Sequence, residues 1–337
     1  MQCITLNYRK FNAWQSQEVN MYKVLVTSKS FARYNPEIIE ELKEKGIEIE
    51  RASVSNMSSE QIAEAVPDYD ALVCGIDRID KTVLEAGKKL KVIHMNGTGV
   101  DHIDVAEASK RHIYVGNCPG ANAQAVAELN LGILLCEARK VVKHSRLIDQ
   151  GRWEREVGVE ISGKTIGVLG LGAIGRRFVE LLQGFRMRVL AYDAAPDLKW
   201  CKAFQVELVD DVNQIYRESD FVSLNLPLLE STQGIINETS LRQMKKEVII
   251  VNTARGGLIE TDALIEALRE KRIRGAALDA FAEEPLDLES PLRELDITMT
   301  PHIGASTIET MKNVTRIVSE HLVEVLIEKN PEHMLNV

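Results

Sequence analysis

The sequence predicts an α/β protein with two domains, each built on a doubly wound parallel sheet. The chain has 337 residues, which is too many for one ordinary hydrophobic core. Short apolar runs alternate with amphipathic helical patterns over residues 22–117, and a second alternating series begins at Lys164. Strands and helices in strict alternation favour a parallel sheet with helices on both faces.

The first alternating series opens with YKVLVT (residues 22–27), a pattern typical of a buried strand. PEIIEELKEKG follows as an amphipathic helix that ends at Gly46. IEIERAS, YDALVC, KVIHMN and IYVGN indicate further strands, with helical patterns between them. Residues 1–20 show no clear periodicity, so we expect an N-terminal arm over residues 1–21 or a functional start at Met21.

The second alternating series lies between two long helical segments. AQAVAELNLGILLCEARKV precedes it, and STIETMKNVTRIVSEHLVEVLIEKN follows it. Both segments are longer than a routine crossover helix, so a helix that bridges two domains or two subunits is plausible for the first. The strands expected between them are KTIGVLG, MRVLAYD, DFVSLNL, EVIIVNTA, IRGAALDA and ITMTPH.

Composition and charge exclude several classes of function. The net charge of −9 argues against nucleic-acid binding, which usually needs a basic face. No apolar run of about 18 residues is present to span a membrane, and the first residues lack the apolar core of a signal peptide. Five cysteines are scattered without a CxxC pair, so we expect no disulfide framework, no metal site and a reducing cytoplasm.

A glycine-rich loop gives the first indication of a ligand. GVLGLGAIGRR places Gly170, Gly172 and Gly175 in G-x-G-x-x-G spacing, between a predicted strand and a predicted helix. This context is typical of a dinucleotide site in which the helix N-terminus faces the pyrophosphate. Asp193 ends the next strand and is expected to bind the ribose hydroxyls, which favours NAD over NADP. Glycines that serve only packing are the alternative.

Three later strands are each followed by a side chain that can take part in catalysis. Arg255 follows EVIIVNTA, Asp279 and Glu284 follow the next strand, and His302 follows ITMTP. In an open parallel sheet these strand ends face the ligand crevice. Each residue alone has a purely structural interpretation, as a strand cap, a turn residue or a packed imidazole. Together they indicate an arginine, an acid and a histidine beside a nicotinamide.

Five motifs in this order resemble the NAD-dependent D-2-hydroxyacid dehydrogenase family. They are GTGVDHIDV, GVLGLGAIGRR, NTARGGLIE, LDAFAEEP and PHIGAST. The resemblance covers about residues 22–330 and is strongest to the phosphoglycerate-dehydrogenase-like branch. It implies an NAD(H)-dependent oxidoreductase that interconverts a D-2-hydroxy acid and its 2-oxo acid by hydride transfer.

The resemblance assigns catalytic roles to Arg255, Glu284 and His302. His302 is expected to donate a proton to the carbonyl oxygen of the 2-oxo acid, and to accept it back in the oxidative direction. Glu284 is expected to orient His302 and favour its charged form. Arg255 is expected to bind the substrate carboxylate and polarise the carbonyl.

The resemblance also implies contacts to cofactor and substrate. Asp279 matches the family residue that binds the nicotinamide carboxamide. The expected cofactor contacts are Thr98, Gly170, Gly172, Ala173, Ile174, Gly175, Asp193, Leu226, Pro227, Thr253, Ala254, Arg255, Asp279, His302, Gly304 and Ala305. The expected substrate contacts are Arg255, His302 and the amides of a loop over Asn96, Gly97, Thr98 and Gly99, for which an ordinary turn is the alternative.

The family architecture implies a Rossmann NAD-binding domain (residues 119–304) inserted into a flavodoxin-like substrate-binding domain (residues 22–118 and 305–337). Both long helices are expected to cross between the domains. A homodimer joined through the NAD-binding domains is expected, with a small-molecule 2-hydroxy or 2-oxo acid as the substrate. His94 and His102 lie near the substrate loop and remain candidates there, whereas His321 and His333 are expected to serve packing or the surface.

The substrate stays open at the level of sequence. Relatives in the phosphoglycerate-dehydrogenase-like branch commonly carry a phosphate-binding arginine after the strand YDALVC, where this chain has Cys74 followed by Gly75. Arg78 or Lys81 could replace that arginine. 3-Phosphoglycerate, glyoxylate or hydroxypyruvate, and pyruvate are therefore all candidates. An NAD-sensing, corepressor-like binding protein is the alternative from another functional class.

Overall fold

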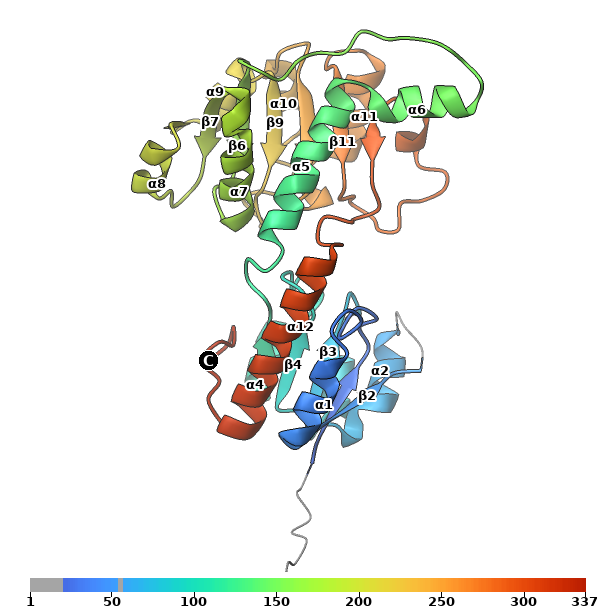
Figure 1. Cartoon of the computed structure of the whole chain (residues 1–337), viewed down its shortest axis with the longest axis vertical. Helices are drawn as coiled ribbons and strands as arrows, with labels where there is room; N and C mark the ends of the chain where they lie inside the picture. The colour runs from blue at the N-terminus through green and yellow to red at the C-terminus, as the bar shows by residue number, and fades with distance from the viewer. Residues whose placement is uncertain (1–20, 54–56) are drawn as a thin grey trace, which may run out of the picture. The chain divides into compact units, whose positions relative to one another are not determined.

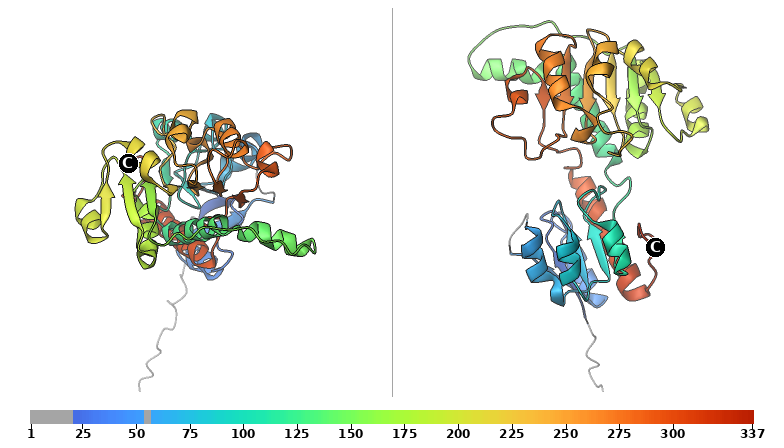
Figure 2. Two further views of the ribbon diagram at one scale, coloured as in Figure 1. Left: turned by 90° about the horizontal axis from the view of Figure 1, so that it is seen from above. Right: turned by 180° about the vertical axis from the view of Figure 1, so that it is seen from behind.

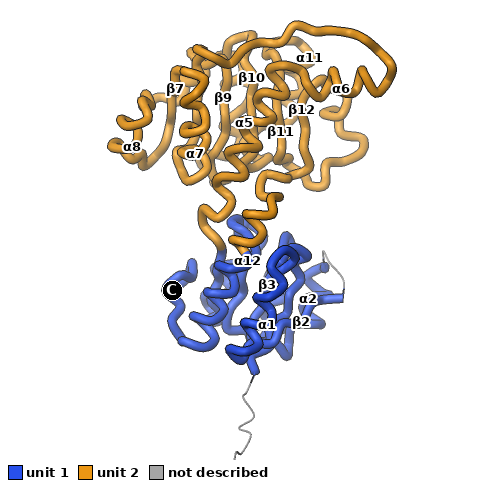
Figure 3. Tube along the Cα trace, viewed as in Figure 1, with its two compact units in different colours: residues 1–117, 315–337 blue, residues 118–314 orange. Residues whose placement is uncertain are grey.

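The computed structural model describes residues 21–53 and 57–337, so the expected N-terminal arm lies, apart from Met21, outside the described residues. The chain forms two compact units (Figure 3). Unit 1 contains residues 1–117 and 315–337, and unit 2 contains residues 118–314. The expectation that both long helices cross between domains is wrong for α5 (Ala123–Ala138), which belongs wholly to unit 2. Helix α12 (Ile308–Val323) begins in unit 2 and ends in unit 1.

Unit 1 contains a five-stranded parallel sheet with the order β2-β1-β3-β4-β5. This is the flavodoxin-like order, in which the direction of winding reverses between β1 and β3. Apart from the edge strand β2, its apolar runs are short and largely buried, as parallel strands require when helices cover both faces. The strands are β1 (Tyr22–Val26), β2 (Ile47–Arg51), β3 (Ala71–Cys74), β4 (Val92–Met95) and β5 (Tyr114–Gly116).

Helices cover both faces of the five-stranded sheet. One face packs against α2 (Ser59–Ala65), α3 (Lys81–Ala86) and α4 (Val105–Lys110) through a core that includes Ile62, Leu84 and Ile93. The other face carries α1 (Glu37–Glu44) and the second half of α12, which are the near helices in Figure 1. Because successive strand residues face opposite sides, His94 of β4 points toward α12, away from Ile93. The 3-10 turn η1 (Val66–Asp68) follows α2, and the π-helical turn η5 (Glu324–Glu328) follows α12.

Unit 2 contains a seven-stranded parallel sheet with the order β12-β11-β10-β9-β6-β7-β8. Counted from β6, this is the Rossmann order with one added edge strand, and the direction of winding reverses between β6 and β9. The two sheets together confirm the predicted fold class. The strands are β6 (Thr165–Leu169), β7 (Arg188–Tyr192), β8 (Val206–Leu208), β9 (Phe221–Leu224), β10 (Ile249–Asn252), β11 (Gly275–Leu278) and β12 (Thr298–Met299).

Two apolar cores lie on the two faces of this sheet. Helices α5, α7 (Ala173–Leu182) and α8 (Leu198–Ala203) cover one face, around Leu134 and Phe178 (Figure 1). Helices α9 (Val212–Glu218), α10 (Glu238–Gln243) and α11 (Thr261–Arg269) cover the other face, around Ile215 and Leu264, seen from behind in Figure 2. The remaining elements are α6 (Val141–Asp149), η2 (Gln183–Phe185), η3 (Gly256–Leu258) and η4 (Pro291–Glu294).

Across residues 21–53 and 57–337, no helix combines the length and the apolar character needed to cross a bilayer.

Candidate active site

The glycine loop follows β6 and begins α7, and each glycine occupies a different environment. Gly170 has a φ of +96°, and a Cβ there would lie 2.6 Å from the Asn225 carbonyl oxygen. A Cβ on Gly175 would lie 2.1 Å from the Gly170 carbonyl oxygen, so only glycine lets α7 pack this close to the loop. A Cβ on Gly172 would meet no atom within 4 Å. The backbone at Gly172 is thus open to a ligand that approaches the N-terminus of α7, the end of a helix that favours phosphates.

Asp193 lies directly beside this loop, at the end of β7. Its two carboxylate oxygens accept hydrogen bonds from the Leu171 amide (2.6 Å) and the Ala195 amide (2.8 Å). These bonds fix the carboxylate at the carboxyl edge of the sheet, and Ala194 and Ala195 beside it are exposed. A carboxylate held in this place suits two ribose hydroxyls and repels a 2′-phosphate.

The neighbouring strand ends complete a cradle that fits a dinucleotide. Leu226 and Pro227 follow β9, the strand next to β6 at the point where the winding reverses. The side chain of Leu226 approaches Gly170. Thr253, which follows β10, is buried, and its hydroxyl has no hydrogen-bond partner within the described residues. A buried hydroxyl without a partner is costly unless a ligand satisfies it. Together with the open backbone at Gly172, it supports a bound NAD at this edge.

A turn stabilised by Asn252 places Arg255 at the end of β10. The Asn252 side chain accepts a hydrogen bond from the Ala254 amide (3.0 Å) and donates one to the Arg255 carbonyl oxygen (2.8 Å). The Arg255 guanidinium donates to the Ala254 carbonyl oxygen (2.9 Å). Sequence reasoning did not single out Asn252. An asparagine at a strand end is nevertheless a usual signal for such a turn, because its side chain accepts a hydrogen bond from the backbone amide two residues later.

Gly256 brings the loop that follows β11 against the loop that follows β10. A Cβ at this position would lie 1.8 Å from the Phe281 carbonyl carbon and 2.2 Å from the Ala282 nitrogen. No side chain fits in that space, so the backbones of the two loops are in direct contact. The contact places Arg255 next to the segment that carries Glu284.

Glu284 and His302 form the pair expected from the sequence. His302 Nδ1 lies 2.6 Å from Glu284 Oε2, and Glu284 Oε1 accepts a hydrogen bond from the Phe281 amide (2.9 Å). Glu284 is therefore held by backbone as well as by the imidazole. The His302 side chain is 47% exposed, so its other ring nitrogen, Nε2, remains available for proton exchange with a substrate.

Asp279 holds the loop on which His302 lies. Its carboxylate is buried and accepts hydrogen bonds from the Thr300 hydroxyl (2.6 Å), the Ile303 amide (2.8 Å) and the Gly304 amide (2.8 Å). These bonds surround His302, which has a φ of +52°. Asp279 thus positions the His302 loop, and its contact with the cofactor stays a prediction. Ala305, another predicted cofactor contact, follows this loop and is exposed.

The predicted substrate loop, residues 96–99, belongs to unit 1 and follows β4. One of its four expected amide donors is already used, because the Asn96 amide donates to the Cys74 carbonyl oxygen (2.9 Å). The amides of Gly97, Thr98 and Gly99 remain the predicted donors to a substrate carboxylate. The Asn96 side chain donates to the hydroxyls of Ser28 and Ser30 (both 2.9 Å), and the Thr98 carbonyl oxygen accepts from Asn117 (2.7 Å). These contacts fix the loop at the carboxyl end of the sheet.

The two histidines considered near this loop have different environments. His94 is fully buried on β4 and bonds to His321. A buried Nε2 atom of His102 has no hydrogen-bond partner among the described residues, although other atoms of that residue do make an interaction. His94 therefore belongs to the packing beneath α12.

The environment disfavours the thiolate form at three of the cysteines in the described residues. Cys74, Cys118, Cys136 and Cys201 are free thiols, and three of them are buried. Burial raises the pKa of Cys74, Cys136 and Cys201 above the ordinary thiol value. Cys74 is the last residue of β3 and is fully buried, so its thiol stays uncharged and shielded from a substrate.

Comparison with known proteins agrees with this geometry. Residues 131–304 match the family described as D-isomer specific 2-hydroxyacid dehydrogenase, NAD binding domain. The chain is 38% identical over 289 residues to a glyoxylate reductase from Thermofilum pendens, covering 83% of this chain and 85% of that protein. The chain belongs to the D-2-hydroxyacid dehydrogenase family.

Other members of the family extend the comparison. The chain is 41% identical over 320 residues to a D-3-phosphoglycerate dehydrogenase from Methanocaldococcus jannaschii, covering 94% of this chain but only 60% of that relative. A crystal structure of a protein from Thermus thermophilus superposes with a TM-score of 0.84 at 33% identity, covering 93% of this chain and 99% of that one. As the family's NAD-binding domain implies, the cofactor is NAD.

Proposed function

We propose that this protein is an NAD(H)-dependent oxidoreductase that interconverts a D-2-hydroxy acid and its 2-oxo acid. The observation that carries the proposal is the His302–Glu284 pair, 2.6 Å apart, in the same unit as the glycine loop. Arg255, Glu284 and His302 come from the ends of β10, β11 and β12, which are neighbours in the sheet. Bound NADH supplies the hydride in the reductive direction.

His302 exchanges the proton. Its Nδ1–H donates to Glu284 Oε2, which leaves Nε2 as the atom that faces a substrate. When protonated, Nε2 donates to the carbonyl oxygen of the 2-oxo acid as that oxygen gains negative charge. In the oxidative direction the neutral Nε2 accepts the hydroxyl proton. Glu284 keeps the ring oriented and stabilises the imidazolium that forms.

Arg255 binds the carboxylate that all 2-oxo acids carry. A guanidinium presents a planar set of N–H donors that matches a carboxylate, and its charge polarises the adjacent carbonyl. The turn held by Asn252 fixes the backbone from which this side chain extends. In unit 1, the amides of residues 97–99 of the substrate loop are a separate candidate set of anion donors.

The loops at the carboxyl end of the unit 1 sheet favour a short, unphosphorylated substrate. After β3 the chain presents the exposed apolar side chain of Ile76 and the carboxylate of Asp77. Asp77 accepts hydrogen bonds from Thr27, Met57 and Gly75, and a buried carboxylate in this loop repels a phosphate. Arg78 pairs with Asp80 at 3.7 Å on the surface. Glyoxylate and hydroxypyruvate fit this loop better than a phosphorylated acid.

A panel of 2-oxo acids tests the proposed activity. NADH oxidation is followed with glyoxylate, hydroxypyruvate, pyruvate and phosphohydroxypyruvate, and NADH binding is measured in parallel by fluorescence. We expect turnover with glyoxylate or hydroxypyruvate at the highest kcat/KM. Folded protein that binds NADH but turns over none of the four contradicts an enzyme. If a pull-down also recovers a stoichiometric protein partner, that result supports the alternative of an NAD-sensing, corepressor-like binding protein. The highest kcat/KM with phosphohydroxypyruvate contradicts the substrate class.

We also propose that the protein forms a homodimer through unit 2, in a reducing cytoplasm. Helix α6 and the segment after it carry apolar side chains that solvent reaches, including Ile148, Trp153 at 81% exposure and Val157 at 89%. Large apolar side chains left exposed along one stretch of the sequence favour burial against a second protein surface. The four free thiols of the described residues support the proposed compartment.

A further inference from the structure

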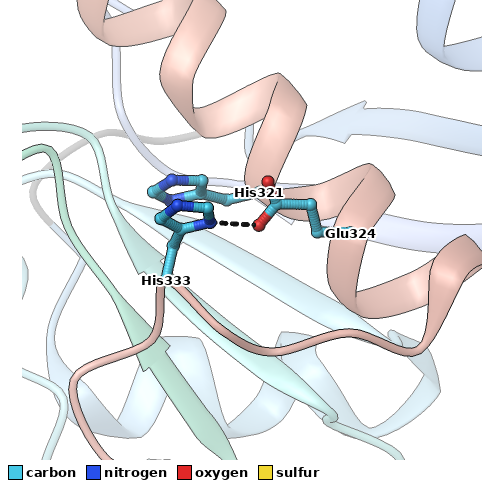
Figure 4. A group of neighbouring side chains, drawn as sticks. All are labelled: His321, Glu324 and His333. Atoms are coloured by element: carbon cyan, nitrogen blue, oxygen red, sulfur yellow. Dashed lines mark hydrogen bonds and ion pairs between the residues drawn. The ribbon is translucent and has the colours of Figure 1, made fainter.

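Three ligand-type side chains meet in unit 1, at residues to which the proposed activity assigns no role. His321 lies near the end of α12, Glu324 begins the π-helical turn η5, and His333 comes from the C-terminal segment. One nitrogen or oxygen atom from each residue lies within 4.8 Å of those of the other two. Figure 4 shows the two imidazole rings lying one above the other, with the Glu324 carboxylate reaching His333.

The fold brings these residues together from two directions. His321 and Glu324 are three residues apart, a spacing that places both side chains on one face of a helix. His333 returns to that face because the C-terminal segment is fixed along β5, the edge strand of the unit 1 sheet. The Leu335 amide donates to the Val115 carbonyl oxygen (2.8 Å), and the Val115 amide donates to the Asn336 side chain (2.8 Å).

A chain of hydrogen bonds sets the tautomer of His321. His94 Nδ1 lies 2.8 Å from the Met95 carbonyl oxygen, which can only accept, so this nitrogen carries the proton. His94 Nε2 then accepts from His321 Nδ1, also at 2.8 Å. His321 Nε2 is consequently an unprotonated acceptor, and no other atom of the described residues bonds to it. A histidine whose other ring nitrogen donates to a fixed acceptor is the usual arrangement of a metal ligand.

We propose that His321, Glu324 and His333 form a binding site for a divalent transition metal ion of the Zn²⁺ type. Two imidazoles and one carboxylate are the donor set that such ions take in proteins, with water in the remaining position. His321 is buried and fixed by His94, whereas the His333 side chain is 58% exposed. A tetrahedral ion holds its ligand atoms about 3.3 Å apart. The exposed His333 ring turns to close the site.

The bound ion fastens the C-terminal segment to α12. Without the ion, a hydrogen bond of 2.9 Å joins His333 of the C-terminal segment to Glu324, which directly follows α12. An ion bound by His321, Glu324 and His333 restrains residues 331–337 along the edge strand β5. If this segment detached, backbone groups of β5 would be left unpaired. The site therefore acts on the stability of unit 1 and is independent of the hydride-transfer residues in unit 2.

Zinc titration of the full chain tests the site. After treatment with a chelator, Zn²⁺ binding is measured by calorimetry, with Mg²⁺ as the hard-cation comparison. We expect one Zn²⁺ per chain at this site and no comparable Mg²⁺ binding. His333→Gln and Glu324→Gln each remove one ligand, and we expect each to weaken Zn²⁺ binding by about 10–100-fold or more. Hydrogen exchange of residues 331–337 is expected to slow on Zn²⁺ addition in the unsubstituted chain but not in the two ligand variants.

Two control variants separate this site from other imidazoles. His112→Asn removes an exposed histidine of the same unit, and asparagine suits the φ of +57° at that position. His302→Ala removes the histidine paired with Glu284. We expect both to bind Zn²⁺ at this site as the unsubstituted chain does. The proposal is overturned if the unsubstituted chain binds no Zn²⁺, if either ligand variant binds normally, if residues 331–337 gain no protection, or if either control loses the binding.

Discussion

At the scale of single residues, His302 shows how a common side chain acquires a specific role. Its Nδ1 is committed to Glu284 at 2.6 Å, and Glu284 is itself held by the Phe281 amide. An imidazole fixed at one nitrogen exchanges protons only through the other. This geometry, more than the presence of a histidine, makes His302 suitable as an acid and a base.

Replacing His302 tests this role. His302→Ala is expected to lower kcat by about 10²–10⁴-fold with the best 2-oxo acid, because the carbonyl oxygen loses its proton donor. NADH affinity is expected to change little, since the glycine loop and Asp193 remain intact. Steady-state kinetics and NADH fluorescence titration measure the two effects. Unchanged kcat in the variant would remove His302 from the mechanism.

The carboxylate of Asp193 is expected to decide between the two nicotinamide cofactors. The unsubstituted enzyme is expected to have a higher kcat/KM with NADH than with NADPH, because a fixed carboxylate repels a 2′-phosphate. Asp193→Ala is expected to narrow that preference. Initial rates with both cofactors and both proteins provide the measurement. A preference of the unsubstituted enzyme for NADPH shows that the adenosine site is misassigned.

At the scale of elements, the loops after β10, β11 and β12 stabilise one another. Asn252 holds the Arg255 turn, Gly256 admits the backbone of Phe281, and Asp279 holds the His302 loop. The proposed catalytic side chains therefore depend on contacts among backbone groups. A change in one loop is expected to affect the others.

Gly256→Ala tests this dependence. The added Cβ would overlap the Phe281 carbonyl carbon at 1.8 Å, so the loop that carries Glu284 must move. We expect the free energy of unfolding to fall by about 1–3 kcal/mol, the usual range for overpacking, and kcat to fall as well. Gly184→Ala is the matched control, because its Cβ would meet no atom within 4 Å. Urea unfolding and steady-state kinetics distinguish the two variants, and equal effects from both contradict the close contact.

A buried carboxylate in α5 makes stability depend on pH. Glu137 bonds to Lys140 (2.6 Å) and Thr298 (2.9 Å), and burial raises the pKa of its carboxyl above the ordinary value of 4.5. The folded chain therefore binds this proton more tightly than the unfolded chain does. Its contribution to the free energy of unfolding is largest below about pH 4.5 and is lost as the pH rises through the raised pKa.

Glu137→Gln removes this titration and keeps the shape of the side chain. The free energy of unfolding of the unsubstituted chain minus that of the variant is expected to decrease as the pH rises from about 4.5 to 8. Urea unfolding of both proteins at several pH values gives this difference. A difference that stays constant or grows with pH contradicts the raised pKa.

At the scale of the whole molecule, the exposed apolar side chains around α6 bear on assembly. Trp153→Ser is expected to weaken the proposed homodimer, because a large ring exposed in one chain is well suited to burial in an interface. Light scattering over a range of concentrations measures the effect. Leu198→Ser, a change at an exposed apolar residue of α8, is the control. A monomer at all concentrations for the unsubstituted chain contradicts the dimer.

The sequence by itself determined the fold class and predicted the residues of the candidate site. Period-two and helical patterns are local, and residues at the ends of consecutive parallel strands must meet at one edge of the sheet. For that reason the glycine loop, Arg255, Glu284 and His302 were predicted from spacing and family resemblance alone. The same reasoning placed Asp193 beside the glycine loop, where its carboxylate contacts the Leu171 amide.

Only the tertiary structure decided which of these residues support one another, and where distant segments meet. The Asn252 turn, the contact at Gly256 and the bonds from Asp279 to the His302 loop depend on loop conformations that no periodicity encodes. His94, His321 and His333 are far apart in the sequence and had been expected near the substrate loop or in ordinary packing. They meet because α12 and the C-terminal segment both return to β4 and β5, and long-range contacts of this kind leave no mark on local spacing.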